Sequence, residues 1–216
     1  MTAFNKHYWL IPAGLIALSV VPVLAGSVRL THLAGGAEVT PENARFFAAP
    51  VPVMLHILSA AIFCLLGAFQ FHPGIRGRWP GWHRGAGSLL VPAGLIAALS
   101  GLWMTQFYPT VDFDGPILYG VRLIVGAGMA LCIGLGVAAI RRRDIDRHRA
   151  WMMRGYALGL GAGTQVLTHL PWFVFPDIRG EMTRAMFMAA GWAINLAVAE
   201  WAISRLPGGL LRATAA

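Results

Sequence analysis

Six long apolar stretches, separated by short polar connections, dominate the sequence and set the expected fold. They cover residues 8–26, 51–71, 86–106, 117–140, 151–170 and 183–204. A helix needs roughly 20 apolar residues to cross the hydrocarbon core of a bilayer, and each stretch is about that long. The connections are too short to hold a separate soluble domain. The pattern therefore predicts one all-α integral membrane domain over residues 1–216, a polytopic transmembrane bundle of six helices.

Composition agrees with a membrane location. Hydrophobic residues make up 57% of the chain and charged residues only 12%, and the mean hydropathy is +0.63. Such values are typical of integral membrane proteins. The only two cysteines, Cys64 and Cys132, lie inside apolar stretches. We expect them to be buried small apolar residues, because they form neither a disulfide framework nor a metal motif.

The first apolar stretch resembles a cleavable signal peptide in one respect. Lys6 precedes it, and it ends in Val23, Leu24 and Ala25 just before Gly26. However, its apolar length exceeds the about 7 to 15 residues of a signal-peptide core. We therefore expect a retained transmembrane helix.

Basic residues are numerous at every second end of the apolar stretches and few at the ends between them. One set of ends holds twelve: Lys6, Arg76, Arg78, Arg84, Arg141, Arg142, Arg143, Arg147, Arg149, Arg154, Arg205 and Arg212. The other set holds five: Arg29, Arg45, Arg122, Arg179 and Arg184. The positive-inside rule then places both termini in the cytoplasm, in a multi-pass protein of the cytoplasmic (inner) membrane. The net charge of +8 is spread over turns that meet anionic lipid headgroups, so the expected partner is the lipid bilayer and not nucleic acid.

Small residues recur every four positions in the fourth and fifth stretches. They are Gly126, Ala130, Gly134 and Ala138 in one, and Gly155, Gly159 and Gly163 in the other. Such ladders allow helices to approach closely in lipid. The basic turns before the third and fifth stretches also share a His-Arg pair, which favours a duplication of helices two to three as helices four to five. We expect a four-helix core of helices 2 to 5, with helices 1 and 6 peripheral.

Histidines lie at both ends of two of the stretches. His56 and His72 bracket the second, His148 and His169 bracket the fifth, and His83 precedes the third. At 1.5 Å per residue, His56 lies roughly 8 Å and His169 roughly 2 to 3 Å below the outer boundary, so their depths allow them to form a pair. His56 and His72 are about 24 Å apart along one helix, so they would serve different groups.

This distribution suits two b-type haems, one near each face, because histidine is a common axial ligand of haem iron. The outer candidates are His56 and His169, and the inner ones are His72, His83 and His148; the iron ligands we expect first are His56, His169, His83 and His148. Arg84, Arg149 and Arg154 could bind haem propionates on the inner side. An alternative for the three inner histidines is helix capping or contact with lipid phosphate. His56 stands out, because an ionisable group inside a span is costly.

The remaining polar residues of the spans have structural interpretations. We expect Gln165 and Asn195 to hydrogen-bond across helices. Glu200 should be neutralised by Arg84 or Arg154, and Arg122 should extend to lipid headgroups.

Four segments resemble a known bacterial family. They are residues 67–71 (GAFQF), 82–87 (WHRGAG), 100–104 (SGLWM) and 148–154 (HRAWMMR). Together they are similar to the family called domain of unknown function 2306, over about residues 51–170. The resemblance implies a small polytopic helical protein of the cytoplasmic membrane and implies no reaction. Where the family pattern has Thr-x-Arg, this chain has Thr164, Gln165 and Val166, so an arginine there is missing and His169 belongs to this chain's own variation.

Three functions follow from these features. The first is a b-type cytochrome-like protein that moves electrons between quinone and a partner through His-ligated haem. The second is a haem-free accessory, scaffold or assembly subunit of a larger membrane complex. The third, a transporter that uses His56, Gln165, Asn195 and Glu200, ranks last because Pro12, Pro22 and Pro92, the candidate helix breaks, are not adjacent to those residues. The motifs of nucleotide-binding and hydrolytic enzymes do not occur, and enzymatic activity is left open.

Overall fold

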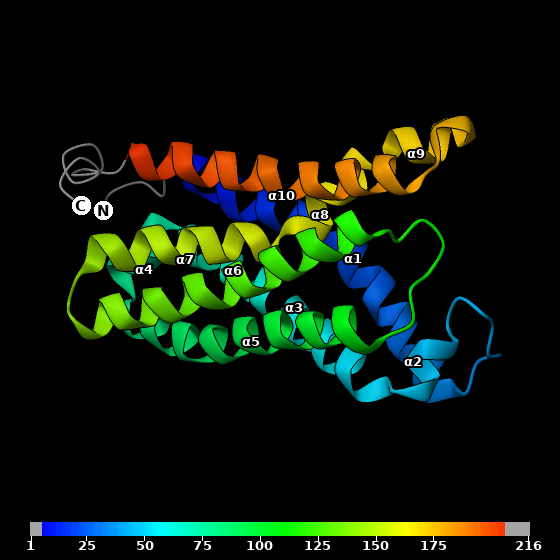
Figure 1. Ribbon diagram of the computed structural model, residues 1–216. Helices are drawn as coiled ribbons and strands as arrows, with labels where there is room; N and C mark the ends of the chain where they lie inside the picture. The colour runs from blue at the N-terminus through cyan, green and yellow to red at the C-terminus, as the bar shows by residue number, and fades with distance from the viewer. Residues whose placement is uncertain (1–5, 206–216) are drawn as a thin grey trace. The chain divides into compact units, whose positions relative to one another are not determined.

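A computed structural model describes residues 6–205, which contain helices and no strand (Figure 1). Arg212, one of the twelve inner basic residues, lies outside the described part, as do the side chains of Lys6 and Arg76. The chain divides into two compact units, residues 1–109 and 110–216, and each is described by itself. The predicted all-α membrane protein is confirmed, whereas the arrangement of helices 2 to 5 as a four-helix core stays a prediction.

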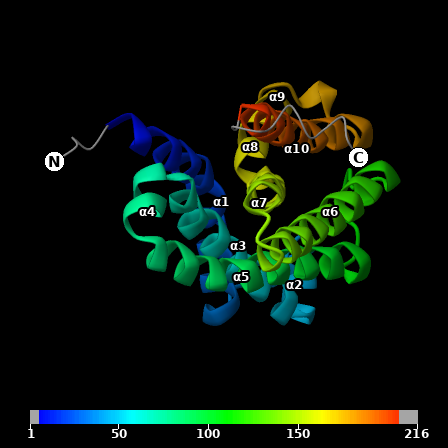
Figure 2. The same ribbon diagram turned by 90° about the vertical axis from the view of Figure 1, so that its left-hand side faces the viewer.

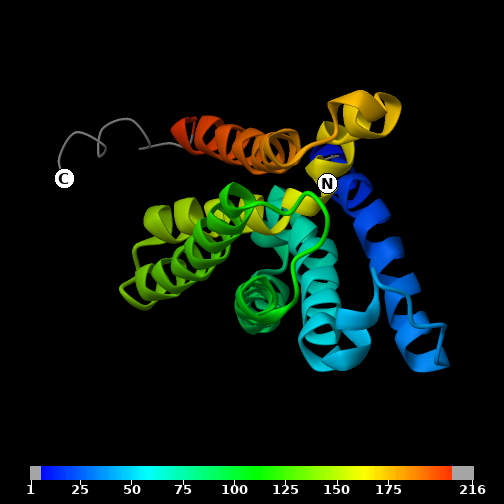
Figure 3. The same ribbon diagram turned by 45° about the vertical axis from the view of Figure 1, so that its right-hand side comes forward.

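Unit 1 is built around two long helices, α3 (Pro50–Ala68) and α5 (Pro80–Phe107), which pack against each other. Helix α1 (Leu10–Gly35) packs on α3 (Figure 3). Shorter elements complete the unit: η1 (Lys6–Trp9), α2 (Ala44–Ala48), η2 (Phe69–Phe71) and α4 (Pro73–Arg78). Phe63 of α3 and Leu90 of α5 are almost fully buried, so the core of the unit lies between these two helices.

Unit 2 is built around a hairpin of α6 (Pro116–Arg141) and α7 (Ile145–Gly159), which lie side by side (Figure 1). Helix α8 (Gly161–Thr168) follows α7 after a one-residue break, and α9 (Leu170–Val174) and η3 (Pro176–Ile178) lead to α10 (Glu181–Ser204). Helix α10 packs against α8, α7 and α6 (Figure 2). The sixth apolar stretch is therefore an integral part of this unit.

Five of the described helices are long and apolar enough to cross a membrane. They are α1, α3 with η2, α5, α6 and α10, with mean hydropathies of 1.4 to 2.4 over their most apolar windows. The predicted span at residues 151–170 is instead divided into α7, of 15 residues, and α8, of 8 residues. Whether this interrupted pair crosses the membrane as one span stays a prediction.

Helix α1 extends nine residues beyond the end predicted at Gly26. Gly26 does not terminate the helix, because it provides room for a neighbour: a Cβ there would lie 2.7 Å from Cγ2 of Ile57 on α3. The helix ends at Gly36, whose φ of 64° is left-handed and favours glycine. The helix thus continues past the apolar stretch that ends at residue 26.

The small-residue ladder predicted on α6 lies on the wrong side of that helix. Gly134 and Ala138 are exposed within unit 2, and a Cβ on Gly134 would meet nothing within 4 Å. Gly128 and Gly136 instead face α7, where they meet Leu158 and Met152. On α7, by contrast, Gly155 of the predicted ladder does face α6, because a Cβ on it would lie 3.1 Å from Cγ1 of Ile133. Close packing of the two helices is confirmed, with a register two residues away from the predicted one on α6.

The break between α7 and α8 falls at Leu160, between two glycines. The backbone N–H of Leu160 still donates to Tyr156 O, but the carbonyl of Ala157 accepts a hydrogen bond from Nδ2 of Asn195 at 3.1 Å. A side chain of α10 thus takes the place of a helical backbone donor, as the absence of water in a bilayer requires. On the other side of the break, Gly161 lies so close to the Trp192 indole that an added Cβ would overlap it.

Candidate functional site

His56 of α3 faces α5 and is held there through Nδ1. That nitrogen lies 2.9 Å from Ala97 O and 3.3 Å from Ser100 Oγ. Gly101 provides the space for the ring, because a Cβ on Gly101 would approach Cε1 of His56 to 3.3 Å. The histidine predicted to be the most significant is therefore fixed by backbone and side-chain groups of the facing helix.

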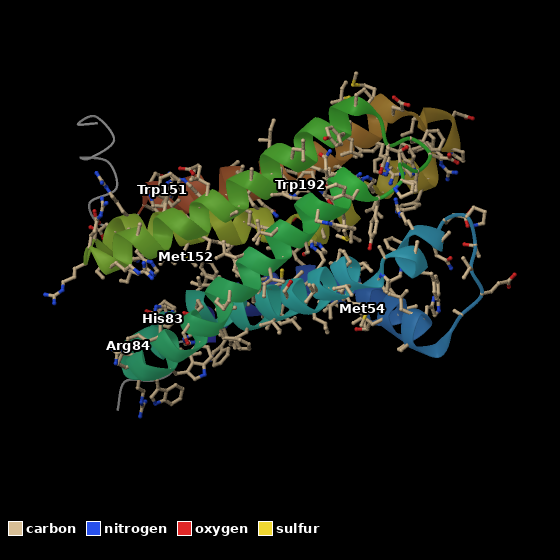
Figure 4. The ribbon with its side chains drawn as sticks, turned by 60° about the horizontal axis from the view of Figure 1, so that its bottom comes forward. Met54, His83, Arg84, Trp151, Met152 and Trp192 are labelled. Atoms are coloured by element: carbon tan, nitrogen blue, oxygen red, sulfur yellow. The ribbon has the colours of Figure 1, made fainter. Side chains whose placement is uncertain are left out.

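His148 has the same kind of anchor in unit 2. It lies in the first turn of α7, which Asp144 caps by accepting from Arg147 N at 3.1 Å. Nδ1 of His148 lies 2.9 Å from Gly136 O on α6. Gly136 is thus both the hydrogen-bond acceptor for the histidine and a close contact of Met152 in the next turn of α7. Figure 4 labels Met152 and Trp151 on this helix.

His169 lies between α8 and α9 and is held by its own helix. Nδ1 lies 3.0 Å from Gln165 O, four residues earlier, and the ring makes an edge contact with Phe187 of α10, with centroids 5.9 Å apart. Arg184 is near enough to interact with it electrostatically. His169 therefore has a defined orientation without an anchor from a neighbouring helix.

These three histidines share one protonation pattern. A carbonyl oxygen can only accept, so Nδ1 of His56, His148 and His169 must carry the proton and, in the neutral ring, Nε2 carries the lone pair. No described residue hydrogen-bonds to Nε2 in any of them. Histidines that bind metals usually donate their other ring N–H to a carbonyl or carboxylate in this way. In all three, the described residues therefore leave the Nε2 lone pair without a hydrogen-bond donor, and their role as ligands stays a prediction.

His72 shows the opposite pattern. The backbone N–H of Ile75 donates to its Nδ1 at 3.1 Å, so the neutral ring carries its proton on Nε2. The side chain is 1% exposed, and among the described residues Nε2 has no acceptor. The rings of Tyr8 and Trp9 pack against it at centroid distances of 6.1 and 4.5 Å. His72 caps α4, which is the alternative considered for the inner histidines, and it is the least suited of the five to bind iron.

His83 and Arg84 lie in the first turn of α5, as Figure 4 shows. His83 is half-buried and Arg84 is exposed. Arg149, in the first turns of α7, is half-buried. The described residues contain no group of three His, Cys, Asp or Glu side chains that could hold a metal ion. A haem needs no such group, so the predicted ligands and propionate-binding arginines stay predictions.

Arg154 forms a bidentate ion pair with Glu200 of α10, with Nε–Oε1 at 2.5 Å and Nη2–Oε2 at 2.8 Å. This confirms Arg154 as the neutralising partner of Glu200. The guanidinium also lies over the Trp151 ring, 4.9 Å from its centroid. Two of its five N–H donors are thus already in use, so any further anion must bind at the remaining ones.

Arg122 does not extend to headgroups as expected. Its Nη1 and Nη2 bind the two oxygens of Asp114 at 2.6 and 3.2 Å. Arg184 of α10 adds an Nε–Oδ1 contact to the same carboxylate at 3.0 Å, and Asp114 is only 7% exposed. The expectation was wrong because the acid lies outside the apolar stretch, in the loop before α6, where the sequence alone gave no sign of a partner.

The predicted cross-helix bonds of Gln165 and Asn195 are confirmed. Gln165 Nε2 donates to Met188 O at 3.0 Å, and Thr164 donates to Asn195 Oδ1 at 2.6 Å. Thr164 and Gln165 follow the break at Leu160 by four and five positions, and Asn195 bonds to Ala157 O, three positions before it. The low ranking of a transporter considered only the breaks at Pro12, Pro22 and Pro92 and missed this one. The glycines on both sides of Leu160 were the available signal. Cys64 and Cys132 are buried and form no disulfide within the described residues, as expected.

Comparison with known families gives one match. A family model described as "Predicted membrane protein (DUF2306)" matches residues 53–203. The match extends past the region of resemblance at 51–170 to include nearly all of α10. Searches of curated proteins and of solved structures found no match.

Proposed function

Because the matched region covers well over half of the chain, the protein belongs to this family of predicted membrane proteins, and we propose that it is a b-type cytochrome-like electron carrier. In this proposal, His56 and His148 each supply an axial ligand to a haem b. The two histidines lie in different units and near opposite predicted ends of the spans. Two haems at different depths would allow electrons to cross part of the membrane.

The observation that carries the proposal is the anchoring of His56. The ring lies within an apolar span, its Nδ1–H is given to Ala97 O, and its Nε2 lone pair has no partner among the described residues. An ionisable group within an apolar span is costly in a membrane, so its presence indicates a functional role. His148 repeats this arrangement with Gly136 O, so a histidine anchored to a facing carbonyl through Nδ1 occurs in both units.

The expected electron donor is a quinol in the bilayer. Its oxidation to quinone releases two electrons and two protons. Haem, when bound, would supply sites that take up these electrons one at a time and pass them to a one-electron acceptor in a partner protein. The protein would supply the axial ligands and keep the haems in an apolar setting, which influences their reduction potential.

Absorption spectroscopy tests this function. Protein expressed with ample haem should show a Soret band and, after reduction by a quinol analogue, a reduced-minus-oxidised difference spectrum of b type. His32, exposed in the last turn of α1, offers a matched control. The His32→Ala variant should keep the full spectrum, whereas His56→Ala should lose part of it. Wild-type protein without a Soret band would exclude the proposal.

A second function is favoured by a different observation. The buried polar side chains at the break of unit 2, Thr164, Gln165 and Asn195, are all hydrogen-bonded within the unit. A core complete without a cofactor suits a haem-free accessory, scaffold or assembly subunit of a larger membrane complex. In that case, the haem-free protein would be fully stable and would co-purify with the subunits of a respiratory complex, and addition of haem would not change its unfolding temperature.

A further inference from the structure

Ser100 and Gly101 begin one of the segments through which the family is recognised, and the proposed function leaves both unused. In the structure they lie directly beside the ring of His56. Ser100 Oγ is 3.3 Å from Nδ1 of His56, and Gly101 is the residue whose missing side chain makes room for the ring. Ser100 is 8% exposed, so its hydroxyl is enclosed in the contact between α3 and α5.

The Ser100 hydroxyl has a single proton, so its other hydrogen bonds determine whether it donates to His56 or accepts from it. The oxygen lies 2.6 Å from Ile96 O and 3.2 Å from Ala97 O, and both of these carbonyls can only accept. The hydroxyl proton therefore goes to a carbonyl, and its lone pairs face His56. The Nδ1–H of His56 thus meets two acceptors, Ala97 O and Ser100 Oγ.

The backbone at Gly101 restricts where the His56 ring can lie. A Cβ at this position would lie 3.3 Å from Cε1 and 3.5 Å from Nδ1 of His56. The first distance is shorter than ordinary van der Waals contact, so an alanine would displace the ring by a few tenths of an ångström. The backbone of α5 at Gly101 therefore supports one side of the ring while Ser100 and Ala97 fix its edge.

We propose that Ser100 and Gly101 are positioning residues, which hold His56 in one tautomer and one ring orientation with Nε2 free to bind a ligand. The proposal rests on the proposed function for the identity of that ligand, haem iron, but the orientation itself belongs to the protein without haem. Residues around a metal ligand that hold its ring typically change metal affinity about 10- to 100-fold when they are replaced.

The test begins with protein prepared without haem, labelled with ¹⁵N in its histidines and held well above the ordinary histidine pKa of about 6.5. NMR should show wild-type His56 with its proton on Nδ1. Ser100→Ala should add a population of the other tautomer, and Gly101→Ala should shift the ring signals. Ser100→Thr keeps the hydroxyl and should restore the wild-type spectrum.

Two variants are matched controls. Ser59 lies in the same helix pair, is equally buried and bonds to Leu55 O four residues earlier, as Ser100 does to Ile96 O; it also donates to the backbone carbonyl of His56 at 3.2 Å, but no hydrogen bond joins it to the His56 ring. Gly87 lies in α5 with open space where its Cβ would be. Ser59→Ala and Gly87→Ala should leave the His56 signals unchanged.

Haem titration of the same set completes the experiment. Ser100→Ala should weaken haem binding about tenfold, with a shift of the electron paramagnetic resonance signal of the ferric haem, and Ser59→Ala should bind haem as the wild type does. Unchanged His56 signals in both Ser100→Ala and Gly101→Ala would overturn the proposal. If the His56 signals respond as expected while even the wild type takes up no haem, the positioning role stands and the proposed function fails.

Discussion

At the scale of single residues, the hydrogen-bond partner of Nδ1 separates histidines that the sequence could not tell apart. The sequence placed His56 and His72 near the two ends of one apolar helix, and this was correct, whereas the stretch that His148 and His169 bracket is divided into α7 and α8. The sequence could not show that a carbonyl faces Nδ1 in three of them and a backbone N–H in His72. For His56 and His148 the acceptor lies on the facing helix, which no local pattern encodes, whereas His169 and His72 bond to residues three or four positions away.

His72 provides a direct test of this distinction. His72→Ala removes the cap of α4, whereas in His72→Asn the amide oxygen can still accept from Ile75 N. The asparagine variant should therefore be more stable than the alanine variant by about 1 kcal/mol in the free energy of unfolding, measured in mixed micelles. Both variants should retain the haem content of the wild type. A loss of haem in both would instead assign His72 as a ligand.

The ion pair of Arg154 and Glu200 has a modest expected strength. The geometry is bidentate, but the Glu200 side chain is 51% exposed and the Arg154 side chain 26%. Solvent screening limits such a pair to about 0.2–1 kcal/mol. A double-mutant cycle with Glu200→Gln and Arg154→Met should give a coupling free energy in this range.

The nearby pair of Arg147 and Asp144 is the control for that cycle. Its N–O distance is 3.4 Å and Arg147 is 69% exposed, so its coupling free energy should be smaller. Equal coupling in the two cycles would show that the bidentate geometry adds nothing.

At the scale of elements, helix positions followed from hydropathy but helix ends and one break did not. Apolar windows located α3, α6 and α10 closely, because bilayer thickness sets their length. Helix α5 begins six residues before the predicted start, at Pro80, which is well suited to the first helical position. The two glycines around Leu160 were a local sign of the break, but the hydrogen bond from Asn195 of another helix to Ala157 O could not be read from the local sequence.

Replacement of Asn195 should destabilise the break. Asn195→Leu leaves Ala157 O without its donor and Thr164 without its acceptor, and the free energy of unfolding should fall by about 1 to 2 kcal/mol. Asn195→Asp keeps an acceptor for Thr164 and so separates the two bonds. Ile194→Ala, at a position that is 47% exposed on the same helix, should change stability by much less. Equal effects of the Asn195→Leu and Ile194→Ala variants would contradict this account of the break.

At the scale of the whole molecule, the chain consists of two units with matching element patterns. His83 is the fourth residue of α5, and His148 is the fourth residue of α7. Likewise, His56 is the seventh residue of α3 and Arg122 the seventh of α6, and both helices begin with proline. These positions agree with the duplication that the two basic turns indicate, which stays a prediction. His56 in one unit corresponds in helix position to Arg122 in the other.

Haem stoichiometry tests the central claim most directly. The pyridine haemochrome assay would be applied to protein purified identically as wild type, His56→Ala, His148→Ala and His32→Ala. The account predicts haem b in the wild type, about half of that content in each of His56→Ala and His148→Ala, and the full content in His32→Ala. Absence of haem from the wild type, or full haem content in both His56→Ala and His148→Ala, would contradict it.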